Sequence, residues 1–381
     1  WRERLFAYRL ADGQRVSQRD VSTSRPDTDP TGLWSGGGAL LSTSWEGRQV
    51  RAYRMPAVED AGWPGRARPG SVLADSVPEI GDPALRAAIR EALGKEPGES
   101  VTAGELAGLE SLSARNSGVR ELAGLEFATG LKELDLGFNP LADLRPLAAL
   151  AALDSLNLDG AALDLTPLAS LAGLRRLSVR HNLLDDLRPL AALTGLTELD
   201  IGDNHIRDLG PLAGLTRLEV LRADRNGIAD LWPLASLADL EALYLGVNRV
   251  RDLQPLAGLE RLRMLRLDGN RLSELHPLSG LKGLADLDLS SNAVGNLGAL
   301  AGLDGLRRLD MRGTAVGDLR PLRGLASLAW VHVGGSRIED LSPLDGLEGL
   351  TVVGRDDLEP PSAGGGRVQR SGSPEPDSAG R

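Results

Sequence analysis

The side chains best suited to chemistry in this sequence are scattered rather than gathered into motifs. There are 4 histidines, and no two have the His-x-x-x-His spacing by which a helix presents two metal ligands. There are no cysteines, which excludes a thiolate nucleophile, a disulfide and a cysteine-ligated metal. The nucleophile sequence Gly-x-Ser-x-Gly and the phosphate-binding P-loop are also absent. The histidines are His181, His205, His276 and His332.

Aspartates recur at fixed spacing, which raises the question of acid–base catalysis of the glycoside-hydrolase type. Such catalysis needs two carboxyl groups, one of them desolvated so that its pKa rises. We expect these aspartates to lie on an open, solvated face, where neither carboxyl group is desolvated. The segment 200–204, DIGDN, is then part of that face rather than a calcium site. The sequence therefore predicts a protein without catalytic residues, metal or cofactor.

Composition excludes two further classes of function. The chain has 381 residues and 41% hydrophobic content, enough for a large core. A net charge of −10 disfavours nucleic acid and anionic membrane surfaces, because both require clustered Lys and Arg. No run approaches the roughly 18 apolar residues that a membrane helix needs. We expect no nucleic-acid partner and no integral membrane segment.

The elements that would position functional side chains come from one repeated unit. From Leu112 a register residue returns every 22 residues, except for one interval of 21 where a residue is missing after Leu163. The unit reads L-x-x-L-x-L-x-x-N-x-I-x-D-L-x-P-L-A-x-L-x-x. A fixed period of this length is the signature of a stacked solenoid. The register residues are Leu112, Leu134, Leu156, Leu177, Leu199, Leu221, Leu243, Leu265, Leu287, Leu309, Val331 and Val353.

Each part of the unit predicts a local structure. The alternation L-x-L predicts a short strand with two leucines facing inward, and stacked units would pair these strands in parallel. An Asn column follows the strand, and its amides are suited to backbone groups that a curved ladder leaves unpaired. We expect weaker ladders where Ala161, Thr314 and Ser336 replace Asn. A Pro column, broken at Ala299, fixes φ and predicts short 3₁₀ turns in place of full helices.

With these features the array resembles leucine-rich repeats, in the 22-residue class of the internalins and SDS22-like proteins. The resemblance covers about residues 78–355. It implies an α/β repeat solenoid: a horseshoe with a parallel concave β-sheet and short 3₁₀ or helical convex segments.

The flanking segments differ in composition. FAYRL at 6–10 returns as RAYRM at 51–55, and this β-rich part is similar to propeller-blade repeats that precede some bacterial leucine-rich arrays. A small β appendage is the alternative. Asp82 and Pro83 open one predicted helix, and Thr102 with Glu105 forms the capping box of a second, so we expect a helical cap. The predicted parts are 1–60 β-rich, 61–77 linker, 78–110 helical cap, 111–355 repeats (about 12 units) and 356–381 disordered tail.

The variable strand positions should face outward on the concave side. Read in order, they predict an apolar centre flanked by arginines, with acidic residues on either side. Aromatic, Met and Arg side chains are typical of interface cores. Scattered surface residues without a role are the alternative. The predicted protein-binding residues are Asp200, Val220, Arg222, Arg225, Tyr244, Met264, Arg266, Asp288, Trp330 and His332.

The sequence thus predicts a non-enzymatic, monomeric scaffold that binds a protein partner. The internalin-like resemblance implies a bacterial surface or secreted protein. Two alternatives stay open. One is an intracellular regulatory subunit of an enzyme such as a phosphatase, as the SDS22-like resemblance implies. The other is a repeat region accessory to a separate catalytic domain.

Overall fold

The computed structural model describes residues 76–161 and 164–354 in full, and four strands before them as backbone. The chain divides into two units, Trp1–Arg68 and Pro69–Arg381. Most of the predicted linker and the predicted disordered tail lie outside the described residues.

The described part of the first unit consists of two antiparallel strand pairs. The recurring motifs FAYRL and RAYRM lie in β1 and β4. Each of these strands pairs with its neighbour in the chain, β1 with β2 and β3 with β4. The choice between a propeller-blade fragment and a small β appendage stays a prediction. The strands are β1 Phe6–Tyr8, β2 Arg15–Gln18, β3 Ala39–Thr43 and β4 Val50–Arg54.

Two helices, α1 (Pro83–Ala92) and α2 (Ala103–Ala107), precede the repeats as predicted. Asp82 Oδ1 accepts hydrogen bonds from the first-turn amides of α1, and Thr102 and Glu105 form the expected capping box. Asp82 Oδ2 also accepts from the amides of residues 120 and 121, which ties the cap to the first repeats. Leu85 and Ile89 form the buried face of α1, whereas Ala92 in its last turn is exposed.

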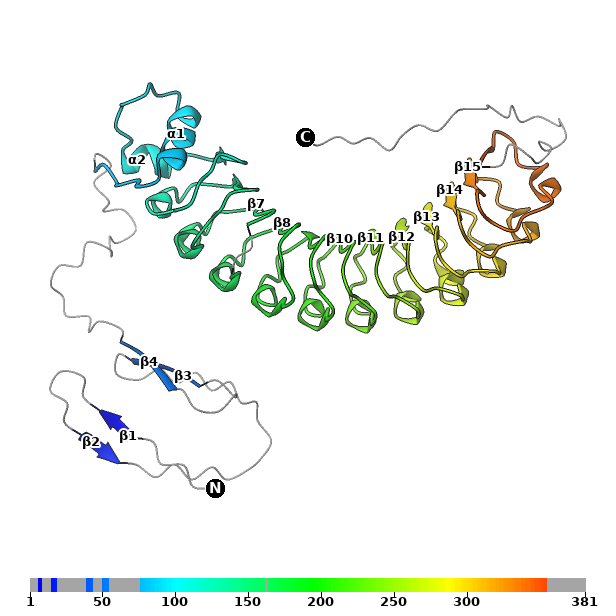
Figure 1. Ribbon diagram of the computed structural model, residues 1–381, viewed down its shortest axis with the longest axis horizontal. Coiled ribbons are helices and arrows are strands. Elements are labelled where there is room, and N and C mark those ends of the chain that lie inside the picture. Colours follow the sequence, from blue (N-terminus) through cyan, green and yellow to red (C-terminus); the bar gives the residue numbers. More distant parts are fainter. Residues whose placement is uncertain are drawn as a thin grey trace. The chain divides into compact units, whose positions relative to one another are not determined.

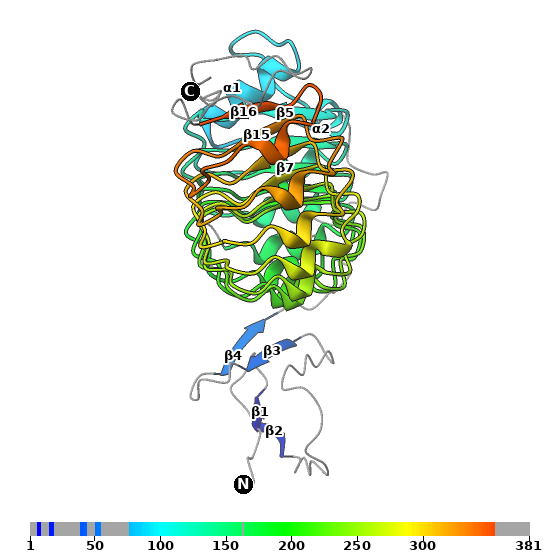
Figure 2. The ribbon, with the colours of Figure 1, turned by 90° about the vertical axis from the view of Figure 1, so that its right-hand side faces the viewer.

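Twelve short parallel strands form one sheet in sequence order. They line the inner side of an arc, and short helical turns line its outer side (Figure 1). Seen at right angles, successive units overlap as one stack of coils (Figure 2). The strands are β5 Ser111–Ser113, β6 Glu133–Asp135, β7 Ser155–Asn157, β8 Arg176–Ser178, β9 Glu198–Asp200, β10 Val220–Arg222, β11 Ala242–Tyr244, β12 Met264–Arg266, β13 Asp286–Asp288, β14 Arg308–Asp310, β15 Trp330–His332 and β16 Thr351–Val353.

The register residues from Leu112 to Val331 pair side by side, as predicted. The last position is a correction, because Val331 pairs with Val352 and not with Val353. The Thr351 amide donates a hydrogen bond to the carbonyl oxygen of Ala329. The final unit therefore has one residue fewer before its strand than the regular units have. No further unit within residues 76–354 packs on β16 to enforce the regular spacing.

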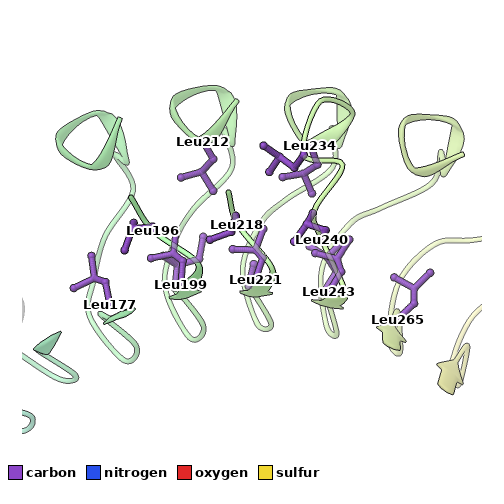
Figure 3. Packing of buried hydrophobic residues seen from close by; sticks show 14 of the residues in the cluster. Leu177, Leu196, Leu199, Leu212, Leu218, Leu221, Leu234, Leu240, Leu243 and Leu265 are labelled. Atoms are coloured by element: carbon purple, nitrogen blue, oxygen red, sulfur yellow. The ribbon is translucent and has the colours of Figure 1, made fainter. Parts of the chain in front are cut away.

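The leucines of each unit fill the space between strand and outer turn. Leu199, Leu221 and Leu243 project from their strands toward leucines of the turns and of neighbouring units (Figure 3). The seven core side chains of the unit around Leu243 are at most 1% exposed. They are Leu243, Leu245, Val250, Leu253, Leu256, Leu259 and Leu262. A single unit buries too little apolar surface on its own to offset the conformational entropy lost when its backbone is ordered. One unit is therefore stable only between neighbours.

The Asn column forms the predicted ladder. Asn248 donates from Nδ2 to Leu245 O in its own unit (3.1 Å) and to Ala223 O in the preceding unit (2.9 Å). Its Oδ1 accepts from Ile228 N at 3.0 Å. Thr314 instead donates to Met311 O at 2.7 Å, within its own unit, as Ser336 does to Val333 O. The shorter side chains thus lose the bonds that join units, as expected.

The outer turns are 3₁₀ helices, and nearly all carry Pro in their first turn. The helix at Ala299 forms without it, so the fold of the unit and not Pro alone sets this conformation. The helices are η1 Leu125–Phe127, η2 Arg145–Ala149, η3 Thr166–Ser170, η4 Arg188–Leu190, η5 Gly210–Leu212, η6 Trp232–Leu234, η7 Gln254–Leu256, η8 His276–Gly280, η9 Gly298–Leu300, η10 Arg320–Leu322 and η11 Ser342–Leu344.

Candidate functional site

The predicted apolar centre lies on β10, β11 and β12, which are neighbours in the middle of the inner side of the arc (Figure 1). Parallel pairing aligns Val220 with Ala242 and Ala242 with Met264. These residues, with Tyr244 and the flanking Arg222, Arg225 and Arg266, form what we call the central patch. The structure therefore brings five of the ten predicted site residues together on these three strands, and Arg225 lies shortly after β10.

Tyr244 is the centre of the patch. Its hydroxyl donates to Met264 Sδ at 2.7 Å, and the guanidinium of Arg222 lies 5.1 Å from the centre of its ring. Tyr244 itself is half-buried, so part of the ring stays accessible to solvent. The aromatic ring is thus held by two neighbours and presented to solvent, as an interface anchor requires.

Arg266, on the other side of the patch, is engaged within the protein. Its guanidinium lies 3.1 Å from Asp288 Oδ2 and 3.5 Å from Asp286 Oδ2. Asp288, predicted as a binding residue, is only 5% exposed. Its Oδ1 accepts from Ser290 N at 2.9 Å. Because its carboxylate is covered by Arg266 and the turn, Asp288 supports the local fold and is not open to a partner.

Asp200 has a similar structural engagement. Its Oδ1 accepts from Gly202 N at 2.8 Å, and Arg180 Nη1 lies 3.8 Å from its Oδ2. Asp310 Oδ1 likewise accepts a hydrogen bond from the backbone amide of Arg312. On β11, where the strand carries Tyr244 at this position, the preceding unit provides the acceptor: Asp224 Oδ1 accepts from Gly246 N at 2.9 Å. Part of the predicted acidic pattern therefore satisfies backbone amides.

The aspartates of the concave side are not as solvated as the sequence analysis expects. Burial is the largest cause that raises the pKa of Asp200, Asp224, Asp268 and Asp286 above the ordinary value. Asp224 and Asp268 converge over Gly246, where a Cβ would lie 2.5 Å from Asp268 Oδ1 and 3.0 Å from Asp224 Oδ1. The expectation failed because neighbouring strands, about 4.8 Å apart, crowd these short side chains and exclude water.

A second column of residues follows the strands, and Arg225 is its one member among the predicted binding residues. The residue four positions after most register residues has positive φ, and several of these residues are not glycine. Val247 (φ 55°) and Phe138 (φ 58°) are 46% and 40% exposed. Left-handed backbone is costly for a β-branched residue. The signal in the sequence is the position just before the Asn column, and we call these residues the edge column.

Phe138 organises a cluster on the edge column. The Arg115 guanidinium lies 4.7 Å from its ring centre, and the His181 ring is 6.1 Å away. The ring lies over Gly160, where a Cβ would come within 2.7 Å of it. This small apolar cluster lies toward the N-terminal end of the array.

Trp330 and His332 form a separate spot on β15. Their rings are 5.7 Å apart in an edge-on arrangement, and the Arg308 guanidinium lies 3.9 Å from the Trp330 ring centre. The His332 Nδ1 accepts from Gly334 N at 3.1 Å, and burial lowers its pKa, so the neutral ring presents Nε2 as a donor. Three strands, β12 to β14, separate this spot from Tyr244.

A hollow of about 260 Å³ lies beside the central patch, over β7 to β10. Small polar residues, among them Ser155, Asn157 and Ser178, line it together with Arg222. No single position of the repeat predicts this hollow, because it arises from small residues on several consecutive strands. Within residues 76–161 and 164–354, no three His, Asp or Glu side chains are grouped to hold a metal.

Comparisons with known proteins agree with this architecture. Residues 173–214 match the family model described as Leucine Rich repeats (2 copies). An internalin (InlF) from Listeria monocytogenes is 30% identical with a TM-score of 0.69, over 72% of this chain and 82% of that chain. The chain belongs to the leucine-rich repeat family. Internalin C2 from the same organism is 36% identical with a TM-score of 0.52, over 53% of this chain and 91% of that chain. A search of curated proteins finds no match.

A third solved structure shows the fold alone. The leucine-rich repeat protein from Leptospira interrogans is 23% identical, with a TM-score of 0.58 over 64% of this chain and 63% of that chain. In the described part of the present leucine-rich repeat protein, every helix is too short or too polar to cross a membrane. The internalin-like class, predicted from the repeat, is confirmed by these neighbours.

Proposed function

We propose that this protein is a non-enzymatic scaffold that binds a protein partner on the concave sheet, with Tyr244 as the principal anchor. The observation that carries the proposal is the half-exposed Tyr244 ring, held by Met264 and Arg222 on the middle strands. Aromatic, Met and Arg side chains at the centre of a surface are the types that dominate interface energetics. The carboxylates of Asp200 and Asp288, on the strands that flank the patch, are engaged with amides and with Arg180 or Arg266, which favours binding over catalysis.

The similarity to internalins supports a bacterial surface or secreted location. We propose that the protein meets its partner there as a monomer. The fold favours such a role because a rigid array holds widely spaced side chains in fixed positions without reordering on binding.

Two aromatic residues on opposite sides of the array provide a matched test. Tyr244 lies on the inner sheet, whereas Trp232 lies on an outer 3₁₀ helix and is 59% exposed. We expect Tyr244→Ser to weaken capture of the partner in cross-linking pull-downs from extracts at least tenfold, about 1.4 kcal/mol or more. Trp232→Ser should leave capture unchanged. Equal capture by both variants and the wild-type protein would remove the concave sheet from the binding site.

A further inference from the structure

Arginines of the concave side and its turns are almost all paired with carboxylates. Seven of them lie 3.9 Å or closer to a carboxylate oxygen, whereas Arg222 has no such partner among the described residues. Arg222 is half-buried on β10, so its guanidinium is also partly removed from water. The paired residues are Arg115, Arg176, Arg180, Arg225, Arg266, Arg308 and Arg312.

The contrast with Arg266 shows why Arg222 is unpaired. Both occupy the same position of their strands, and each pairs in register with an aspartate: Arg266 with Asp288 and Arg222 with Asp200. Arg266 bonds its aspartate at 3.1 Å. Asp200 is instead held by Gly202 N and faces Arg180, while the guanidinium of Arg222 lies over the ring of Tyr244. The guanidinium of Arg222 is therefore fixed over the ring without a salt bridge in the described part of the repeats, although its charge still offsets part of the rise that burial causes in the pKa of Asp200.

Arg222 borders the hollow over β7 to β10, which provides space for an incoming group. A water molecule takes up about 30 Å³, so a volume of about 260 Å³ holds several waters or one short side chain. The other charged residues of the hollow are Arg176, Glu198 and Asp200. Arg176 is bound to Asp154 at 2.8 Å. Glu198 lies at the far end of β9 from Arg222, and Asp200, which is in register with Arg222, is engaged by Gly202 N and Arg180. In the part of the chain that the structure describes, Arg222 is therefore the cation of the hollow that has no bound carboxylate.

We infer that Arg222 binds an aspartate or glutamate side chain of the partner, and that the partner places a neighbouring apolar side chain on Tyr244 and Met264. This inference rests on the proposed function and names the chemistry of its site. A guanidinium binds a carboxylate through two parallel hydrogen bonds, which fixes position as well as charge. The stacked ring of Tyr244 holds the guanidinium before binding, so little side-chain entropy is lost.

The test uses a displayed library of random dodecapeptides, selected on the full chain. Peptides that lose binding to Tyr244→Ser are retained. We expect them to carry Asp or Glu at a fixed distance from an aliphatic or aromatic residue, and to bind Arg222→Gln and Arg222→Lys at least tenfold more weakly. Arg176→Gln is the matched control in the same hollow, and its affinity should stay within twofold. Glu198→Gln removes a negative charge that repels an acidic peptide, so this variant should bind more strongly.

The results distinguish a failure of the Arg222 inference from a failure of the proposed concave binding site. Because Arg222 makes no ion pair in the described chain, Arg222→Gln should keep the melting temperature of the wild-type protein, which excludes misfolding as a cause of weak binding. Tyr244-dependent peptides without an acidic residue, or with equal affinity for Arg222→Gln, would overturn the inference and leave the concave scaffold intact. If no selected peptide depends on Tyr244, both the inference and the proposed function are contradicted.

Discussion

At the scale of the residue, position within the unit decides what a side chain does. Aspartate after the strand leucine accepts a backbone amide on the concave side, as Asp200 does from Gly202. Aspartate before the Pro column caps an outer turn, as Asp252 does for Gln254 N at 2.8 Å. Asp318 does the same for Arg320 and also pairs with its guanidinium. One residue type therefore serves distinct structural purposes, set by solvation and by its neighbours.

The buried aspartates make stability depend on pH. Burial, followed by the charge of Asp288, raises the pKa of Asp268. Between the ordinary and the raised pKa the folded protein holds a proton that the unfolded chain has lost. The free energy of unfolding therefore falls as pH rises through that interval. We expect Asp268→Asn to raise the melting temperature at neutral pH, with the gain disappearing near about pH 3, where the carboxyl group is protonated in both states.

Asp318 is the control of opposite sign. The hydrogen bond from the Arg320 side chain is the largest cause that lowers its pKa, so its ionised form favours the folded state above the ordinary pKa. Asp318→Asn should then lower the melting temperature at neutral pH, and the loss should shrink as pH falls. The same sign for both variants would contradict this account of the concave carboxyl groups.

At the scale of the element, the Asn ladder and the strands determine how firmly one unit holds the next. The polar side chain at position 314 bonds only within its own unit, although Asn292 one unit earlier reaches Leu267 O across the junction at 2.8 Å. The capped helix α1 is joined to the first repeats by Asp82. The side-chain bonds that join units therefore vary along the array and are replaced by bonds within the unit at Thr314 and Ser336.

Restoring the ladder at position 314 should strengthen that junction. In Thr314→Asn the amide can donate to Leu289 O and accept from Val294 N, by analogy with Asn292. Each added bond contributes about 1 kcal/mol to the free energy of unfolding, which urea denaturation measures. Thr314→Ala is the matched control and should lose stability, because it removes the bond to Met311 O. If Asn and Ala have the same effect, the ladder does not contribute at this junction.

The elements predictable from sequence are those that repeat the same local rule. Leucine spacing, the Asn ladder and the outer turns need only one unit and its copy above, so Leu243, Asn248 and Pro255 indicate them directly. Contacts between different columns could not be read in this way. The unpaired guanidinium of Arg222 and the covered carboxylate of Asp288 depend on which neighbouring side chain reaches each group first. Composition of a single column does not encode that competition.

At the scale of the whole molecule, the array is continuous, and a defect in its middle should be felt on both sides. Leu243 is fully buried at the centre of the stack. Leu243→Asp buries an unpaired charge, and we expect a loss of at least about 4 kcal/mol in the free energy of unfolding. Hydrogen exchange should show lost protection in the central units that declines toward the ends.

Leu183 is the matched control, because it is a leucine of the same array that is 72% exposed. Leu183→Asp should leave both the denaturation midpoint and the exchange pattern unchanged. A stably folded Leu243→Asp protein would mean that the core does not depend on this register.

In-register stacking also fixes the distances between residues along the array. Tyr244 and Trp330 lie on β11 and β15, and each intervening strand sets them about 4.8 Å further apart. Duplication or loss of one 22-residue copy between them would change their separation by that step while leaving each spot intact. A change in the number of repeats can thus alter the distance between these two contact points without changing the residues of either one.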